Sequence, residues 1–300
     1  MTHAVFTRRR VLQIAAAVPL AGLGATARAA APVAQWHGVA LGAQSQILIA
    51  GLDAQEAAPV FATVQDEIAR LEAVFSLYQS RSELSRLNAT GGLADPSPDL
   101  LTVLSLSRAV WTASLGAFDP SIQPLWQARA AGVEPPLLGH DLGSLRLSAN
   151  RVSLAPGMAL TLNGIAQGYI TDKVAKLLRD QGLTDVIVNA GEQYAMGARP
   201  DGTPWQVGIS DPADGLVSQV SLTDRALATS SIQGTLLNED QGHIIDARTG
   251  LSATQWSTIS MLHDSAAVAD ALSTAACCLT TEETADMLTH FADAQIAYRA

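Results

Sequence analysis

The sequence predicts an α+β fold, built as a single compact domain of mixed sheets and helices. Segments with helical spacing and segments with strand character follow one another without the regular strand–helix–strand rhythm of a doubly wound sheet. Hydrophobic residues make up 48% of the 300 positions, which is enough for a sizeable core, and no internal repeat or clear linker divides the chain. One large domain or two intimately packed ones would satisfy these observations, and we assign residues 30–300 to one domain.

The first half of the chain carries four segments with a regular pattern. Residues 43–51 have strand character. Residues 54–75 predict a helix, because one face collects the apolar side chains Val60, Val64, Ile68 and Leu71. Residues 100–112 predict a second helix, and residues 144–162 predict short strands around a turn at Ala155-Pro156-Gly157.

The second half continues with both element types. Residues 168–181 predict a third helix, and strands are expected at 185–189 and 205–209. A further strand is expected at 257–262, and it leads into a helix of mostly small, apolar residues between Ser265 and Leu279.

Residues 1–29 have the pattern of an export signal. The basic run Arg8-Arg9-Arg10 precedes an apolar stretch at 14–23, and a small-residue cleavage pattern, Ala27-Arg28-Ala29, follows. The arginine pair with Val11-Leu12 behind it is typical of the twin-arginine route, which carries folded and often cofactor-loaded proteins. The apolar run falls short of the roughly 20 residues of a membrane-spanning helix. We therefore expect a periplasmic protein with no stable membrane insertion after cleavage.

The mature chain is strongly acidic. Four of the 18 basic residues are arginines of the predicted signal, which leaves 14 basic against 28 acidic residues and a net charge of −14. Such a surface argues against nucleic acid or an anionic membrane as the partner.

The helix expected near the C-terminus carries a carboxylate in an apolar setting. Asp270 and Thr274 are one turn apart and share a face. A buried carboxylate must be paired, hydrogen-bonded or bound to a metal, and a carboxylate beside a hydroxyl suits Mg²⁺. The alternative is that Asp270 is an N-terminal helix cap. The adjacent Cys277 and Cys278 cannot form an unstrained disulfide, and we interpret both as buried core residues.

Two segments of the first half are candidates for a ligand site. Tyr78 offers a flat apolar face with a polar tip, which can stack on a planar ligand, and the alternative is ordinary packing at a helix end. In the run Gly116-Ala117-Phe118-Asp119-Pro120, aspartate before proline forces an extended or turn backbone, with Phe118 as an anchor. A purely structural turn explains that run equally well.

A third candidate is the run Asn163-Gly164-Ile165-Ala166-Gln167-Gly168, which leads into the helix that bears Lys173. Two glycines four apart, between a strand and a helix, let backbone groups approach a ligand phosphate at a helix start. The run is not a G-x-G-x-x-G fingerprint, and the chain has no P-loop signature, so Rossmann and Walker sites are excluded.

The fourth candidate is the segment 242–250, with the sequence GHIIDARTG. His243, Asp246 and Arg248 place an acid–base candidate, an acceptor and a phosphate-type cation within six positions. A lone histidine is more often structural, but the aspartate and arginine so near to it favour a function.

Taken in this order, the segments resemble the ApbE family of FAD:protein FMN transferases, including its NosX-like periplasmic members. The resemblance spans residues 75–279, and its most specific parts are the glycine-rich run, the His-Ile-Ile-Asp-x-Arg-Thr-Gly run and Asp-Ala-Leu-Ser-Thr-Ala. It implies a protein outside the cytoplasmic membrane that binds FAD and Mg²⁺. Such a protein moves FMN onto a threonine of an acceptor flavoprotein and releases AMP.

The resemblance also implies roles for single residues. The metal ligands would be Asp270, Thr274 and the backbone carbonyl of Ala166. His243, beside the pyrophosphate, and Asp270 are the catalytic candidates, because a nearby histidine or carboxylate could take the proton of the threonine hydroxyl. The residues that would contact the flavin nucleotide are Tyr78, Gly116, Ala117, Phe118, Asp119, Gly164, Ile165, Lys173, His243 and Arg248.

Three departures from the family pattern keep other functions open. Gln167 stands where many relatives have lysine, Glu192-Gln193 follows Gly191 where they have Gly-Asp, and Ala247 replaces a proline. The first two lie near the expected phosphates and metal, and they could weaken transfer while FAD still binds. The alternatives are an FAD-binding accessory protein of a periplasmic respiratory system and a Mg²⁺-dependent FAD hydrolase.

Overall fold

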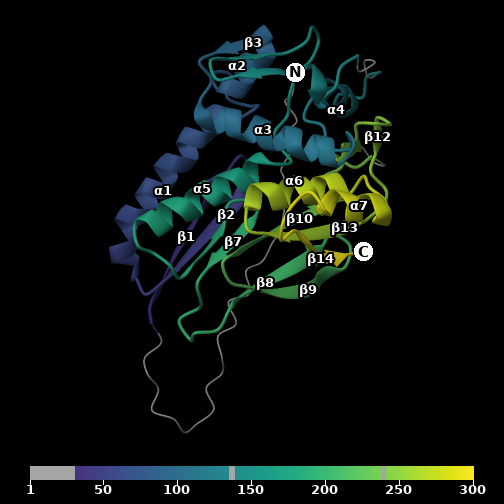
Figure 1. Cartoon of the computed structure of the whole chain (residues 1–300). Coiled ribbons are helices and arrows are strands. Elements are labelled where there is room, and N and C mark those ends of the chain that lie inside the picture. The colour runs from purple at the N-terminus through teal and green to yellow at the C-terminus, as the bar shows by residue number, and fades with distance from the viewer. Residues whose placement is uncertain (1–30, 135–138, 238–240) are drawn as a thin grey trace.

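The computed structural model describes residues 31–134, 139–237 and 241–300, so the expected export signal lies outside the described residues. Helices cover one face of a central β-sheet, and a two-stranded hairpin covers part of the other (Figure 1). This arrangement confirms the predicted α+β fold. Within the three described ranges, no helix is long and apolar enough to cross a membrane.

The central sheet has seven strands in the order β1-β2-β6-β7-β10-β13-β14, and each neighbouring pair is antiparallel. β1 and β2 are joined at Leu41-Gly42, which have positive φ values of 46° and 81°, as a tight two-residue hairpin turn requires. The seven strands are β1 (Val33–Ala40), β2 (Ala43–Ala50), β6 (Val186–Asn189), β7 (Gln193–Met196), β10 (Arg225–Ser231), β13 (Thr258–His263) and β14 (Gln295–Arg299).

Three smaller sheets flank the central one. β3 (Gly92–Ala94), β5 (Arg151–Ser153) and β4 (Arg146–Ser148) form a three-stranded sheet in that order. β8 (Trp205–Asp211) pairs with β9 (Gly215–Leu222), and β11 (Ile245–Asp246) pairs with β12 (Leu251–Ser252).

Four longer helices form the layer on the sheet and against one another. They are α1 (Ala54–Phe75), α3 (Pro98–Ala113), α5 (Ala166–Asp180) and α6 (Ala266–Ala276). α1 starts at a capping box in which Asp53 and Glu56 bond each other's backbone N–H groups. Shorter helices are α2 (Glu83–Thr90), α4 (Gln123–Ala130), α7 (Thr281–Leu288) and the 3₁₀ turn Leu142–Ser144.

The main core lies between this helical layer and the sheet. One hydrophobic cluster unites Ile47 and Ile49 of β2 and Val188 of β6 with Leu71 of α1 and Ile170 of α5. A second, smaller cluster on the opposite face packs β8 against the sheet. α6 contacts α5, β10 and β13, and it therefore carries its polar side chains into the interior.

The structure agrees with most predicted elements and corrects one of them. The first predicted helix has the observed bounds, and the others are displaced by a few residues at their ends. The exception is 144–162, where β4 and β5 pair with each other before the turn at 155–157. After that turn, the only described bridge is a single parallel one between Ile122 and Ala159.

Candidate active site

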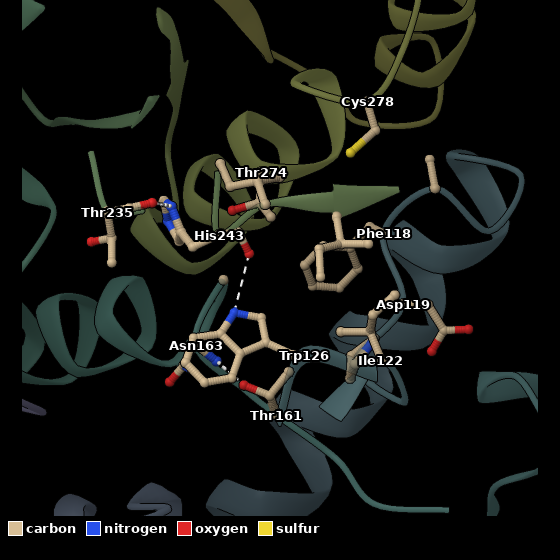
Figure 2. A pocket seen from close by; sticks show the side chains of 15 residues that line it. Phe118, Asp119, Ile122, Trp126, Thr161, Asn163, Thr235, His243, Thr274 and Cys278 are labelled. Carbon is tan, nitrogen blue, oxygen red and sulfur yellow. Dashed lines mark hydrogen bonds between the residues drawn. The ribbon is translucent and has the colours of Figure 1, made fainter. Parts of the chain in front are cut away.

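A cavity of about 860 Å³, counted with its open mouth, lies where four segments meet (Figure 2). Its walls come from the loop 117–122 with Trp126 of α4, the extended run 161–164, Thr235 with the segment 243–245, and the end of α6. The first two segments are joined because Thr161 donates its N–H to the carbonyl of Pro120 at 2.8 Å. The cavity is thus built almost entirely from segments that the sequence singled out.

Hydrogen bonds to Thr235 and Trp126 hold His243 on one wall. Its backbone N–H and its ring Nδ1 both contact the carbonyl oxygen of Thr235, at 3.1 Å and 3.0 Å. The indole Nε1 of Trp126 donates to the His243 carbonyl at 3.1 Å. Because a carbonyl oxygen only accepts, Nδ1 carries the proton, and in the neutral ring Nε2 is the basic nitrogen. This geometry suits a general base.

Thr274 lies on the wall formed by α6, close to Gly164. Its hydroxyl is 3.4 Å from the Ser230 hydroxyl of β10. A Cβ added to Gly164 would lie 2.9 Å from Thr274 Oγ1 and 3.3 Å from the Phe118 ring. Glycine at position 164 therefore lets the run 161–164 approach both side chains, and no larger residue fits without displacing them.

Asp270 lies one turn before Thr274 and is fully buried. The N-cap of α6 is Ser265, whose side chain accepts from Val268 N–H, so Asp270 does not cap its own helix. Instead, Asp270 Oδ2 accepts the N–H of Gly168, in the first turn of α5, at 3.1 Å. The positive end of the α5 dipole favours a carboxylate at this position.

The same place could hold a hard metal ion. Asp270 offers a carboxylate, Thr274 a hydroxyl, and Ala166, the first residue of α5, a backbone carbonyl. An all-oxygen donor set of this kind fits Mg²⁺. Among the described residues, no group of three or more His, Cys, Asp and Glu side chains could hold a metal, so a site here depends on the hydroxyl and carbonyl ligands.

The turn 116–121 shapes the opposite wall. Gly116 has a positive φ of 84°, and Ala117, Phe118 and Asp119 all line the cavity. Asp119 is buried and accepts the N–H groups of Ser121 at 2.7 Å and Leu142 at 3.0 Å. Burial nevertheless raises the pKa of this carboxyl. Asp119 therefore fixes the turn, and Phe118 supplies an apolar wall.

A second hollow adjoins the cavity at Asp119. Trp111, Gly116, His140 and Arg248 are among its lining residues. Arg248 donates to Asp246 and Glu283, both at 2.8 Å, and the hydrogen bond to Asp246 is the main reason that its pKa lies above the usual range.

Three of the predicted nucleotide-contacting residues line neither the cavity nor the second hollow. The Tyr78 side chain is 76% exposed, in the loop between α1 and α2. Lys173 pairs with Asp99 of α3 at 2.9 Å. Ile165 is buried between Gly164, which lines the cavity, and the first residue of α5, and it does not line the cavity itself.

Two further expectations are revised by the packing. A Cβ at Gly168 would lie 2.2 Å from the Ala266 carbonyl oxygen, so this glycine allows α5 to meet α6 and not a phosphate. Cys277 is buried as expected, but Cys278 is partly exposed and lines the cavity. Burial raises the pKa of the Cys278 thiol.

The residues that depart from the family pattern lie behind the cavity. Gln167, Glu192 and Gln193 are buried, and Glu192 Oε2 accepts the N–H of Thr229 at 3.1 Å. Gly191 has a φ of 111°, and a Cβ there would lie 2.8 Å from the Gln167 side chain. The Gln167 side chain therefore packs directly on the turn that precedes Glu192.

Sequence reasoning singled out the run that ends at Trp126 but gave Trp126 no role of its own, and it assigned no function to Thr235 or Cys278. Trp126 lies shortly after the Asp-Pro turn, and its indole N–H is a signal that a buried acceptor must be near. Thr235 acts through its backbone carbonyl, which no side-chain pattern reveals. Cys278 follows the α6 helix, where burial was the simpler interpretation.

Comparison with known proteins agrees along most of the chain. A family model described as "ApbE family" matches residues 41–298. An FAD:protein FMN transferase from Treponema pallidum is 32% identical over 272 residues, covering 74% of this chain and 75% of the relative. One from Vibrio cholerae serotype O1 is 30% identical and covers 71% and 72%.

Solved structures give the same picture. The flavin transferase ApbE from Vibrio cholerae has a TM-score of 0.73 at 25% identity, covering 86% of this chain and 91% of that one. The ApbE protein from Thermotoga maritima has a TM-score of 0.76 at 22% identity, covering 86% and 90%. The second likeness concerns the fold alone.

Proposed function

Because this chain belongs to the ApbE family, we propose that it is a Mg²⁺-dependent transferase that moves FMN from FAD to a threonine of an exported or membrane redox flavoprotein and releases AMP. Relatives named FAD:protein FMN transferase support the reaction class. Support for the site comes from this chain's own residues.

The observation that carries the proposal is that a basic nitrogen and an oxygen donor set share one cavity. His243 and Thr274 both line it, and the fully buried Asp270 lies one turn behind Thr274 against the start of α5. A buried carboxylate one turn from a hydroxyl is a suitable ligand pair for a hard metal ion.

Asp270, Thr274 and the Ala166 carbonyl would hold the metal. When bound, Mg²⁺ would supply charge that neutralises the pyrophosphate oxygens. Gly164 lets the run 161–164 pack closely against Thr274, and Phe118 and Trp126 give the cavity an apolar wall.

In the proposed reaction the threonine oxygen of the acceptor forms a bond to the phosphorus of the FMN half. The bond from that phosphorus to the bridging oxygen breaks, and the oxygen leaves with AMP. His243 Nε2 accepts the hydroxyl proton, because Nδ1 is engaged with the Thr235 carbonyl.

The test is to mix purified protein, FAD and Mg²⁺ with a candidate acceptor that carries a threonine motif, and to look for covalent flavin fluorescence in a denaturing gel. We expect a fluorescent acceptor band and one AMP per flavin transferred. His243→Ala should abolish the band, whereas His290→Ala, an exposed histidine outside the cavity, should not.

The same assay separates the alternatives. AMP release without a labelled acceptor would indicate an FAD hydrolase, and tight FAD binding without turnover would indicate an accessory protein. Gln167 and Glu192, behind the cavity, are the positions at which these alternatives would arise. Calorimetry should show FAD bound more tightly than FMN or ATP, and tighter ATP binding would contradict the assignment.

We also propose export by the twin-arginine pathway to the periplasm, on the basis of residues 1–29. Replacing both Arg8 and Arg9 by lysine should leave the precursor in the cytoplasm. A normal periplasmic yield of mature protein from that variant would contradict the proposal.

A further inference from the structure

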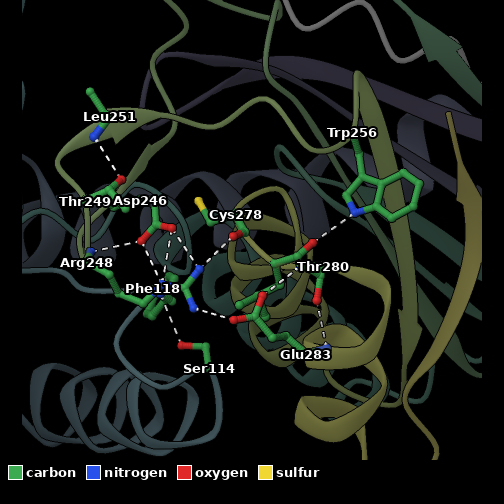
Figure 3. A network of polar contacts seen from close by, with 11 residues as sticks. Ser114, Phe118, Asp246, Arg248, Thr249, Leu251, Trp256, Cys278, Thr280 and Glu283 are labelled. Carbon is green, nitrogen blue, oxygen red and sulfur yellow. Dashed lines mark hydrogen bonds and ion pairs between the residues drawn. The ribbon is translucent and has the colours of Figure 1, made fainter.

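Arg248 connects the loop after β11 to the corner between α6 and α7 (Figure 3). Its Nε and Nη2 donate to the Asp246 carboxylate at distances between 2.8 and 3.2 Å. Nη2 also donates to the carbonyl of Cys278 at 2.9 Å, and Nη1 donates to Glu283 Oε1 at 2.8 Å. All three guanidinium nitrogens therefore have protein acceptors.

The acceptors of Arg248 lie where the main cavity meets the second hollow. Asp246 follows Ile245, which lines the main cavity, and Cys278 lines it from the opposite segment. Arg248 and Ala247 line the adjoining second hollow. The guanidinium is thus part of the wall between the two hollows, and its side chain is 28% exposed.

The anchor on the helical side is itself rigid. Glu283 is the N3 residue of the capping box that begins α7, where its second oxygen accepts the Thr280 N–H at 2.8 Å. A carboxylate fixed in this way cannot follow a displaced loop, because moving it would also break the cap.

We propose that Arg248 is a positioning residue, which fixes the loop that carries His243 against the segment after the helix that carries Thr274 and does not itself bind a phosphate. The inference rests on the proposed function, because that function gives His243 and Thr274, on opposite walls of the cavity, roles in the same reaction. Through its three acceptors, this one side chain ties the two walls together.

The shape of arginine is needed for this role. A guanidinium bonds several acceptors in fixed directions, whereas a lysine ammonium is a compact charge that cannot reach three separate acceptors with the same geometry. Arg248→Lys should therefore behave like Arg248→Met. A phosphate-binding cation would instead tolerate lysine in part.

The experiment measures kcat, the dissociation constant of FAD and the alkylation rate of Cys278 in both variants. We expect kcat to fall about tenfold or more, while FAD affinity changes little. Cys278 should be alkylated about tenfold faster, because its segment loses the bond to its carbonyl. Fragmentation of the labelled peptide between the two adjacent cysteines distinguishes a label on Cys278 from one on the buried Cys277.

Arg70→Lys is a matched control. Arg70 bonds Glu67 and Asp99 at 2.7 to 2.8 Å in a similar network on α1, away from the cavity lining. It should change neither kcat nor the labelling of Cys278.

Unchanged kcat and labelling in Arg248→Lys would overturn the inference, and so would a large loss of FAD affinity in Arg248→Met that lysine restores. Labelling does not require turnover. Suppose that Arg248→Lys is labelled faster than the native protein, but the native protein neither transfers FMN nor hydrolyses FAD. This result would support the positioning role of Arg248 and would contradict only the proposed function.

Discussion

Asp172 of α5 and Asp270 of α6 each accept hydrogen bonds from the first turn of the other helix. Comparing them shows how a purely structural aspartate differs from a candidate metal ligand. Asp172 of α5 accepts the N–H groups of Ala266 and Ala267, at 2.7 and 3.0 Å, and the Ser265 hydroxyl at 2.6 Å. Asp270 of α6 accepts the N–H of Gly168 at 3.1 Å. Each helix thus supplies the carboxylate for the start of the other.

The two aspartates differ in what surrounds them. The three donors around Asp172 all belong to the start of α6, away from the cavity lining. Asp270 lies one turn from Thr274, in the part of α6 that forms the cavity wall. The same side chain at the same kind of position is therefore a structural tie in one case and a candidate ligand in the other.

The largest expected effect is on Asp270. Asp270→Asn keeps an oxygen that can accept the Gly168 N–H, but it removes the charge that a metal needs. We expect transfer or hydrolysis to fall by about 10²–10³, since a lost metal removes several kcal/mol of transition-state stabilisation. Stability should change by no more than about 1 kcal/mol, measured by urea unfolding.

The next largest effect is expected for Asp172, and it concerns only the free energy of unfolding. Asp172→Asn offers one oxygen to three donors, so at least one buried hydrogen bond is lost. We expect a cost of about 1–3 kcal/mol in the free energy of unfolding, with kcat unchanged under conditions where the protein is folded. A variant that folds normally but loses turnover would show that the two aspartates do not divide their roles in this way.

The smallest expected effect is the pH dependence of the stability that Asp172 contributes. Burial raises the pKa of Asp172 above its ordinary value of 3.8, although the hydrogen bonds from Ser265, Ala267 and Ala266 and the charge of His263 act in the opposite direction. A raised folded-state pKa means that the contribution of Asp172 to stability is complete below the unfolded pKa and is lost as pH rises through the folded one. The stability of the native protein relative to Asp172→Asn should therefore decrease with rising pH. A difference that increased with pH would mean that the hydrogen bonds, and not burial, dominate.

The sequence was a good guide to the elements that carry a long apolar pattern. The helix 54–75 was predicted with its observed bounds, because apolar residues recur on one face, and Val64, Ile68 and Leu71 of that face are buried. The strands β1, β7, β9, β10 and β14 and the short helices α2, α4 and α7 are among the elements that were not predicted. The shortest of them hold too few residues for a periodicity, and the central strand β10 shows no alternation because all of its inner positions are buried.

The candidate site was predictable where a side chain belongs to a recognisable sequence pattern. His243, Thr274 and the Phe118 turn were named from sequence, and the structure brings them to one cavity. The reciprocal caps were not predictable, since Asp172 and Asp270 are joined to partners about 100 positions away through backbone N–H groups. The partners of Lys173 and Arg248 likewise depend on which acidic residues the fold places beside them.

Calorimetric titration of Mg²⁺ into the purified protein saturated with FAD tests the central claim most directly. The protein, and Asp172→Asn as the matched control, should bind about one ion, whereas Asp270→Asn should bind none and Thr274→Val should bind more weakly. Wild-type Mg²⁺ affinity in both Asp270→Asn and Thr274→Val would mean that the metal site is elsewhere and that Asp270 is as structural as Asp172.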